Sequence, residues 1–414
     1  MSSSSMLNRF LATLLCFVGS LTVVSQEIVE DSSTAPNISE EQHSLEHVLT
    51  VAGVTDTEIL FGQSCALSGL NGASGQGMQV GIQAAFNEIN NADGVHGRTL
   101  KLITLDDRYE PELTIENTNQ LIDIHGVFSL IGAVGTPTSR VAVDIAQNNS
   151  VPYIGPLTGA AFLRDEREVV INLRASYAQE TEAMIEFLTR EVGTTRIATF
   201  YQDDSYGRAG HNGAKAAMER RGLKLLPSGV YRRNSLDVRK GVLDVMGGEP
   251  EAVVMIGAYE PSAEFILWSR KVGLNAIFIN ISFVNSNALA NALGDDGTGV
   301  MVSQVVPFPK SDSLEIARQY RNSLAVLDGD LEPGFFSFEG YLVGRLAILG
   351  LERVGRELTR ERFLDAIRSI NDVDLDGFLL DFETDNQGSD RVFMTVLTED
   401  GTFRAVETIE DLSP

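Results

Sequence analysis

The sequence predicts an α/β fold in which two doubly wound lobes are each built on a parallel sheet between layers of helices. The first reason is a strand–loop–helix unit that repeats through most of the chain, because such alternation is typical of open parallel sheets. The second reason is that the series begins again after the polar junction RDEREVVINLRAS (164–176). The third reason is length, since 414 residues are too many for one compact core.

The first unit contains a strongly amphipathic helix. An apolar strand that begins at Glu58 leads through the loop LNGASGQG (70–77) into the segment MQVGIQAAFNEINNADG (78–94). Apolar residues recur there at intervals of three and four, which predicts one buried face, whereas Asn87 and Glu88 are expected to face water. The residues expected on the buried face are Met78, Ile82, Ala85, Phe86 and Ile89.

The remaining elements follow in the same alternation. Short runs rich in apolar and β-branched residues indicate strands, and apolar spacing of three and four indicates helices. The stretch RVFMTVLTEDGTFRAV (391–406) is predicted to form a hairpin around Glu399-Asp400-Gly401. The other expected strands are 99–107, 127–132, 151–155, 196–201, 224–230, 252–257 and 276–282, and the other expected helices are 141–149, 178–191, 210–221, 237–246, 261–272, 333–355 and 361–370.

The charge balance argues against two classes of partner. The formal net charge is −25, so nucleic acids and anionic membranes, which both present phosphate, are not expected to bind. No glycine loop is followed by a P-loop lysine, and the motif GxGxxG is absent after the first strand, so no nucleotide cofactor is predicted. The segment Gly72–Gln76 lacks the last glycine of a GxSxG nucleophile elbow. The protein is therefore not expected to be an enzyme. A hydrolase on a similar scaffold is a weaker alternative than the two binding functions considered below.

The N-terminal residues are expected to serve export rather than the fold. Residues 1–25 place a polar leader before the apolar run FLATLLCFVGSLTVV and small residues before Gln26, as in a signal peptide. A lipid anchor on Cys16 is not expected, because the preceding Thr13–Leu15 is a poor lipoprotein cleavage context. Residues 26–55 are predicted to be an acidic flexible tether. His43 and His47 within it lack a third ligand for a metal, and Cys65 is left without a disulfide partner.

Several segments in order resemble a known family. SGLNGASGQG, NADGVHGRTLKL, LDDRYEP, GAVGTPTS, VPYIGP and YQDDSYGRAG are together similar to type I periplasmic solute-binding proteins of the branched-chain amino-acid receptor group, over about residues 57–400. The resemblance implies a clamshell of two Rossmann-like lobes joined by three crossovers, which traps a small molecule between the lobes. The lobes would comprise 57–173 plus 308–382 and 174–307 plus 383–410, with crossovers near Asn172–Ala175, Val305–Pro309 and Asp381–Asn386.

The segment Gly135-Thr136-Pro137 is a candidate anion site. Pro137 suits the first position of a helix and Thr136 suits its N-cap, so free backbone amides are expected to face a bound carboxylate there. The alternative is that Thr136 only caps its helix. The resemblance assigns the ligand's carboxylate to Thr136 and to the loop Leu157-Thr158-Gly159, and it adds Ser74 from the first glycine loop, which is otherwise explained as a tight turn.

The facing lobe is expected to supply aromatic contacts. The resemblance places Tyr206 and Tyr259 against the ligand, where each offers a flat apolar face and a hydroxyl. Amino-acid binders of the family carry an acidic residue that neutralises the ligand's ammonium, and here that position is Ser282. A neutral hydroxyl cannot offset a buried ammonium, so Glu260 or Asp204 would have to supply the charge.

These observations predict an exported, monomeric solute-binding protein that delivers a small organic ligand to an ABC permease. The ligand is expected to be amino-acid-like or a carboxylate or amide. A sensory protein that presents its ligand occupancy to a membrane receptor is the alternative on the same fold.

Overall fold

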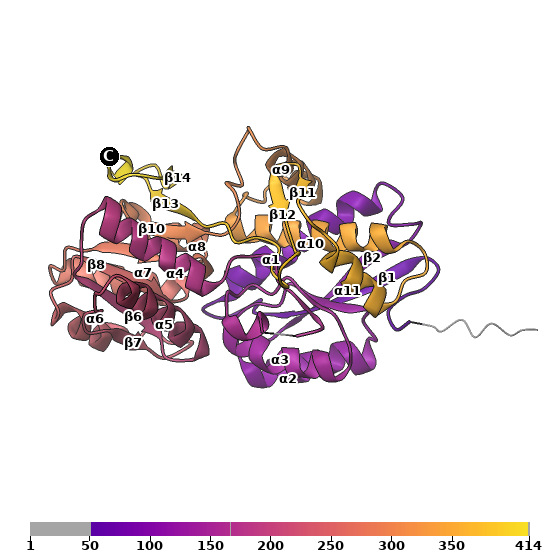
Figure 1. Cartoon of the computed structure of the whole chain (residues 1–414), viewed down its shortest axis with the longest axis horizontal. Helices are drawn as coiled ribbons and strands as arrows, with labels where there is room; N and C mark the ends of the chain where they lie inside the picture. Colours follow the sequence, from indigo (N-terminus) through magenta and orange to yellow (C-terminus); the bar gives the residue numbers. More distant parts are fainter. Residues whose placement is uncertain (1–50, 166, 413–414) are drawn as a thin grey trace, which may run out of the picture. The chain divides into compact units, whose positions relative to one another are not determined.

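The computed structural model describes residues 51–165 and 167–412. The predicted signal peptide, almost all of the predicted tether, and the pair His43 and His47 lie outside these residues. The described part of the chain forms two main sheets, whose elements appear as separate groups in Figure 1.

The first sheet is entirely parallel. Its strand order is β2-β1-β3-β4-β5, and β1 pairs with β2 along its whole length, from Glu58 opposite Thr99 to Cys65 opposite Asp106. Parallel strands must be joined by crossover connections, which are usually helices, and helices α1 to α3 follow β1, β2 and β3 in turn. The strands are β1 (Glu58–Cys65), β2 (Thr99–Asp106), β3 (Ser129–Ile131), β4 (Tyr153–Ile154) and β5 (Val170–Ile171).

The second sheet joins a parallel part to an antiparallel hairpin. Its order is β14-β13-β10-β9-β8-β6-β7, with parallel pairing from β10 to β7 and antiparallel pairing of β10 with β13 and of β13 with β14. The predicted terminal hairpin is therefore confirmed. The strands are β6 (Ile197–Gln202), β7 (Gly229–Tyr231), β8 (Ala252–Ile256), β9 (Ile277–Asn280), β10 (Met301–Gln304), β13 (Phe393–Leu397) and β14 (Phe403–Val406).

Within the described residues the chain passes three times between these sheets. It leaves the first sheet after β5, leaves the second after β10, and returns to the second at β13. Between the last two passages lie helices that pack on α1, and a small antiparallel pair of β11 (Val373–Leu375) with β12 (Phe378–Leu380). We call the first sheet with α1 to α3 and α9 to α11 lobe 1, and the second sheet with α4 to α8 lobe 2. The residue boundaries predicted for the lobes stay a prediction.

Eight of the helices match the periodic segments, with differences at their ends, whereas α2, α8 and α9 were not predicted from the sequence. Helix α1 begins at Gly72, six residues before the expected start, and α5 begins at Ser205, because Asp204 accepts the backbone amides of Tyr206 and Gly207 and so caps it. Strand β7 covers only the end of the expected strand 224–230. The helices are α1 (Gly72–Asn90), α2 (Pro111–Asn119), α3 (Thr136–Asn148), α4 (Tyr177–Glu186), α5 (Ser205–Arg220), α6 (Arg239–Met246), α7 (Tyr259–Lys271), α8 (Ser286–Leu293), α9 (Glu315–Leu327), α10 (Phe335–Val354) and α11 (Arg360–Arg368).

Glycines allow α1 and α10 to touch through their backbones. A Cβ on Gly81 would lie 1.9 Å from the Ser337 carbonyl oxygen, and a Cβ on Gly340 would lie 2.5 Å from the Met78 carbonyl oxygen. The expectation that Glu88 faces water holds only in part, because its side chain is 38% exposed but its carboxylate also accepts the Tyr341 hydroxyl at 2.6 Å. The packing of α10 on α1 therefore gives Glu88 a hydrogen-bond partner that the helical periodicity of α1 does not predict.

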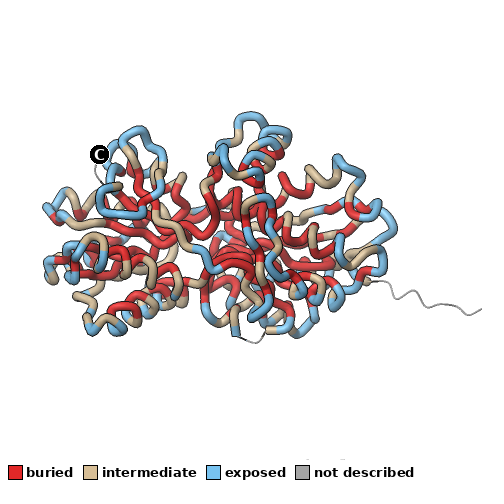
Figure 2. The backbone as a smooth tube through the Cα atoms, turned by 45° about the horizontal axis from the view of Figure 1, so that its top comes forward, coloured by how far each residue is buried: buried red, intermediate tan, exposed pale blue. Residues whose placement is uncertain are grey.

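Buried residues follow the strands of both sheets and continue from one lobe into the other (Figure 2). Cys65 is buried and forms no disulfide. None of the helices in residues 51–165 and 167–412 has the length and apolar content needed to cross a membrane. The same residues hold no cluster of three or more His, Cys, Asp or Glu side chains placed to bind a metal ion.

The close approach of α1 and α10 predicts a large effect of one methyl group. We expect Gly81→Ala to lower the free energy of unfolding by about 1–3 kcal/mol or more, because its Cβ meets backbone atoms that cannot move separately from α10. Urea denaturation measures this. The control is Gly247→Ala, at an exposed helix end where the nearest atom is 3.5 Å from the new Cβ, and its effect should stay within about 0.5 kcal/mol. A similar small effect for both variants would contradict the packing argument.

Candidate ligand-binding site

Aromatic rings from both lobes meet between the two sheets. Tyr206, at the start of α5, lies with its ring centroid 5.5 Å from that of Tyr177 and 4.6 Å from that of Phe283. The ring of Tyr109, which follows β2 in lobe 1, lies 6.0 Å from Phe283. All four side chains are buried, so these rings form a continuous apolar wall with hydroxyl groups set into it.

Thr136 and Thr158 form a hydroxyl pair beside this wall. Their Oγ1 atoms are 2.6 Å apart, and both side chains are buried. The prediction that Thr136 is the N-cap is wrong, because α3 begins at Thr136 and the residue before the helix is Gly135, with φ 103°. The hydroxyl of Thr136 therefore bonds to Thr158 and does not cap α3. This also rules out the alternative that Thr136 serves only as the cap of its helix.

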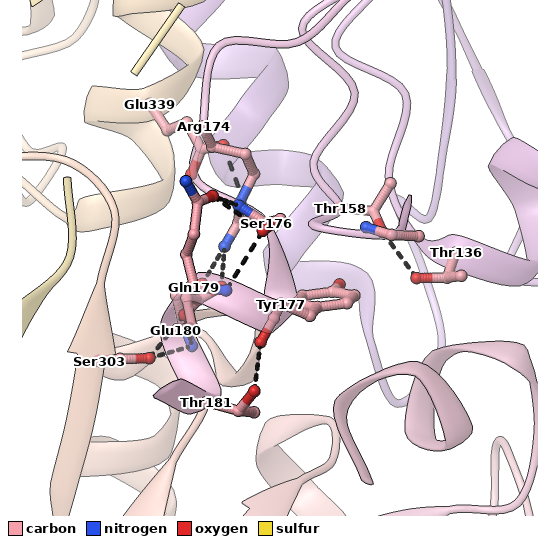
Figure 3. Close-up of polar contacts among 12 residues, drawn as sticks. Thr136, Thr158, Arg174, Ser176, Tyr177, Gln179, Glu180, Thr181, Ser303 and Glu339 are labelled. Carbon is pink, nitrogen blue, oxygen red and sulfur yellow. Dashed lines mark hydrogen bonds and ion pairs between the residues drawn. The ribbon is translucent and has the colours of Figure 1, made fainter. Parts of the chain in front are cut away.

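Tyr177 points at this pair of threonines (Figure 3). No hydrogen bond of acceptable geometry from the described residues reaches its hydroxyl, although the side chain is buried. Burial raises the pKa of Tyr177, and the nearby charge of Arg174 and hydroxyls of Thr158 and Thr136 only partly oppose this. A buried hydroxyl without a partner is rare in folded proteins, so Tyr177 has unused hydrogen-bonding capacity next to the threonine pair.

A strained turn holds Tyr109 in place. Arg108 and Tyr109 both have positive φ, 52° and 62°, which is costly for side chains of this size. Asp107 compensates by accepting the Tyr109 amide at 2.9 Å and the Ser64 hydroxyl at 2.9 Å. Burial raises the pKa of Asp107 to about 6. Gly135 is required beside this turn, because a Cβ there would lie 2.2 Å from the Tyr109 ring.

A buried ion cluster lies next to the aromatic wall. Arg174, at the first passage between the lobes, donates through Nη2 to Glu180 of α4 at 3.2 Å and also to the Ser282 hydroxyl. Its Nη1 lies 3.7 Å from Glu339 of α10. Arg174 and Glu180 are fully buried and Glu339 is 2% exposed. Figure 3 shows Arg174 and Glu180 on the other side of Tyr177 from the threonine pair.

Ser282 is part of this cluster. Its backbone amide donates to Glu180 at 3.0 Å, its hydroxyl donates to the same carboxylate at 3.0 Å, and Ser303 donates to it at 2.6 Å. An acidic group therefore does lie beside position 282, but it comes from Glu180 on α4 and is paired with Arg174. The sequence assigned this role to Glu260 or Asp204.

Those two acids lie elsewhere. Asp204 caps α5, accepts the Gln202 side-chain amide at 2.6 Å and faces Arg233 at 3.6 Å, so its charge is already engaged. Glu260 is half-buried on the first turn of α7. Among the described residues, neither Asp204 nor Glu260 forms a hydrogen bond with Ser282.

The remaining predicted site residues occupy two places. Leu157 and Gly159 flank Thr158, and a Cβ on Gly159 would lie 2.5 Å from the Tyr177 amide, so this loop packs directly on α4. Ser74 is buried in the first turn of α1 and donates to Asn71 at 3.0 Å. Tyr259 is half-buried at the start of α7. Burial and the charge of Glu260 raise the pKa of Tyr259, and a hydrogen bond from the backbone amide of Ala73, the residue before Ser74, partly opposes this.

Several residues around the site were not identified from the sequence, namely Tyr109, Arg174, Tyr177, Glu180, Phe283 and Glu339. Two signals in the sequence point to them. Glu339 interrupts the apolar run FFSFEGYLVG, where a charge needs a buried partner, and Arg174 lies in the junction at which the strand–helix series restarts. Their pairing joins residues that are 165 positions apart, from 174 to 339, and local periodicity carries no information about such a contact.

Glu110 gives a further contact between the lobes at the edge of the site. This residue precedes α2 in lobe 1, and it accepts hydrogen bonds from Arg233 at 2.8 Å and Asn234 at 2.7 Å, both after β7 in lobe 2. Gln202 of β6 also reaches the Tyr109 hydroxyl at 3.4 Å. Polar contacts at Glu110 and at Tyr109 therefore join the two lobes in addition to the ion cluster.

The ion cluster predicts a pH dependence of stability. Burial raises the pKa of Glu339 from its ordinary 4.5 to about 7, against the lowering effect of Arg174. A raised carboxyl pKa means that the folded state holds the proton more tightly, so the contribution to stability is present below about pH 4.5 and is lost as the pH rises through 7. Between pH 5 and pH 8, wild type should lose on the order of 2 kcal/mol more of its unfolding free energy than Glu339→Gln, measured by urea denaturation.

The matched control for this experiment is Glu357→Gln. Glu357 is an exposed glutamate paired with Arg362 on the surface, and exposed pairs contribute little. It should therefore keep the wild-type pH profile. Parallel profiles for wild type and Glu339→Gln would contradict the raised pKa.

Comparison with known proteins places this geometry in a family. A family model described as periplasmic binding protein matches residues 58–402. A Leu/Ile/Val-binding protein homolog 3 of Brucella melitensis is 22% identical over 308 residues, which cover 73% of this chain and 81% of that protein. A leucine-, isoleucine-, valine-, threonine- and alanine-binding protein of Pseudomonas aeruginosa is 22% identical over 302 residues, with 71% and 78% covered.

Solved structures agree with this assignment. The crystal structure of a possible leucine/isoleucine/valine-binding protein from Rhodopirellula baltica is similar with a TM-score of 0.82 and 38% identity, and the match covers 87% of this chain and 98% of that one. A leucine-binding protein of Thermotoga maritima shares the fold at 20% identity, with a TM-score of 0.77. The chain therefore belongs to the periplasmic binding protein family and has the type I fold of the leucine/isoleucine/valine-binding proteins.

Proposed function

We propose that this protein captures a small organic ligand between its lobes and delivers it to an ABC importer after export to the periplasm. The family consists of substrate-binding proteins and not of enzymes, and the relatives' names describe amino-acid binding. The observation that carries the proposal is the buried Thr136–Thr158 pair with the unpartnered Tyr177 hydroxyl aimed at it, between aromatic rings from both lobes. Such a combination of apolar walls and a few convergent polar groups is typical of small-molecule sites.

The polar end of the ligand is proposed to be a carboxylate or amide held at the start of α3. Thr136, Thr158 and the backbone from Gly135 and from Leu157 to Gly159 would hold its oxygens, since helix N-termini favour negative charge. Tyr206 is proposed to contact the ligand's apolar part, because its ring belongs to the wall. Ser74 and Tyr259, which approach each other across the lobes through Ala73, are proposed as the outer contacts.

The ligand is proposed to lack a free α-amino group, unlike the amino acids named for the relatives. Ser282 supplies no charge of its own, and the nearby Glu180 is already paired with Arg174. An ammonium buried there would stay without a counter-ion, which costs several kcal/mol.

Substitution of Thr136 tests the anion clamp. We expect Thr136→Val to lose a charge-assisted hydrogen bond of about 1.5–3 kcal/mol, or about tenfold to a hundredfold in affinity. Calorimetry with the small carboxylic acid that most raises the melting temperature in a thermal-shift screen measures it. Thr118→Val is the control, because the Thr118 hydroxyl is buried and bonds only to its own helix, at the Thr114 carbonyl. Unchanged affinity for Thr136→Val would remove Thr136 from the site.

Titration of the wild type tests the missing ammonium. After unfolding and refolding to strip bound ligand, leucine, isoleucine and valine should bind at least about a hundredfold more weakly than acids of the same shape without the α-amino group. Micromolar binding of leucine would contradict this. If Glu260→Gln then abolished leucine binding, Glu260 would be the neutralising acid.

A further inference from the structure

We propose that Arg174 is a specificity-determining residue, an internal cation that takes up the charge of Glu180 and thereby excludes ligands that carry an ammonium group. The inference rests on the proposed function, because it concerns the polar end of the same ligand site. It assigns a role to the ion cluster of Arg174, Glu180 and Glu339, which lies beside Tyr177 and is shielded from solvent.

Glu180 has no acceptor capacity left for a ligand. A carboxylate offers about four lone-pair sites. Glu180 fills them with the Ser282 amide, the Ser282 hydroxyl, the Ser303 hydroxyl and Arg174 Nη2. A ligand ammonium could bind Glu180 only by displacing one of these donors, and each of them is itself buried.

Arg174, by contrast, retains unused donors. Its Nε and Nη1 have no hydrogen-bond partner of acceptable geometry among the described residues, and the same holds for Glu339 Oε1, which faces Nη1 at 3.7 Å. The guanidinium therefore has donors to spare and no acceptor of its own, and the free acceptor beside it, Glu339 Oε1, faces Nη1. An ammonium group brought next to it would meet a like charge without water between them, whereas an acceptor oxygen would satisfy the free donors.

Arg174 also lies near the proposed carboxylate site. Arg174 precedes α4 by three residues, and α4 begins with Tyr177, whose ring points at Thr136 and Thr158. The cluster and the threonine pair thus lie on either side of one side chain. Ser282, the position that the resemblance assigns to the partner of the ammonium, accepts a hydrogen bond from Arg174 and donates one to Glu180, so an α-amino group at that position would meet the positive charge of Arg174.

The test uses pairs of probes that differ only in the ammonium group. These are leucine with 4-methylpentanoate, and phenylalanine with 3-phenylpropanoate. The measured quantity is the ratio of the two dissociation constants within a pair, determined by calorimetry at pH 8 on refolded full-length protein. Wild type is compared with Arg174→Met, Arg174→Lys and Glu339→Gln.

Arg174→Met should shift the ratio at least tenfold toward the amino acid, because Glu180 loses its counter-ion. Arg174→Lys keeps the charge and should keep the wild-type preference, even if both affinities fall. Glu339→Gln removes a negative charge and should shift the ratio in the opposite direction, toward the deaminated acid. A merely structural role would weaken both members of a pair alike and leave every ratio unchanged.

The outcomes separate two kinds of failure. Equal ratios in wild type, Arg174→Met and Glu339→Gln, or a shift in Arg174→Lys equal to that in Arg174→Met, would overturn the role of Arg174 alone. If Arg174→Met does not fold, as judged by circular dichroism, the other two variants still test the proposal. The ratio of dissociation constants should be unchanged in Arg174→Lys and should shift toward the deaminated acid in Glu339→Gln. Binding of no member of either pair to any variant would overturn the proposed carboxylate site, and the role of Arg174 with it.

Discussion

The buried guanidinium of Arg174 is the constraint around which the middle of this protein is organised. A charge removed from water must be paired, because an isolated buried ion costs far more than a fold can supply. The compensating groups come from separate parts of the chain: Glu180 from α4, Ser282 and Ser303 from the ends of two strands in lobe 2, and Glu339 from α10 in lobe 1. Compensation of one charge therefore ties the passage between the lobes to both of them.

In the apolar regions, glycines allow helices, loops and aromatic rings to pack closely against one another. Gly81 lets α10 lie on α1, Gly135 makes room for the Tyr109 ring, and Gly159 lets the loop after β4 touch the start of α4. At each position a Cβ would meet atoms that cannot move away separately. The strained turn at Arg108 and Tyr109 belongs to the same system, because Asp107 and its hydrogen bonds hold Tyr109 against lobe 2. The aromatic wall thus depends on glycine and aspartate residues that never join it.

The charge pattern connects this architecture with the solute. The threonine pair and the helix start offer donors to an anion, and Arg174 offers further donors beyond Tyr177. The acids near the site, Glu180, Asp204 and Glu110, are engaged with arginine or with backbone amides. This pattern of donors is the basis of our proposal that the ligand is an anion or amide without a free ammonium group.

The sequence by itself determined the α/β class, most of the alternation of strands and helices, the terminal hairpin and the threonine and glycine loops after the strands, but it did not reveal helices α2, α8 and α9 or strand β10. These follow from local periodicity and from the chemistry of turns, which act over a few residues. Tertiary structure decided what periodicity cannot carry: that Thr136 bonds to Thr158 instead of capping its helix, that Glu88 bonds to Tyr341, and that Glu180 takes the place beside Ser282. The physical reason is that a buried polar group must find a partner in space, and that partner can lie 165 residues away, as Glu339 does from Arg174.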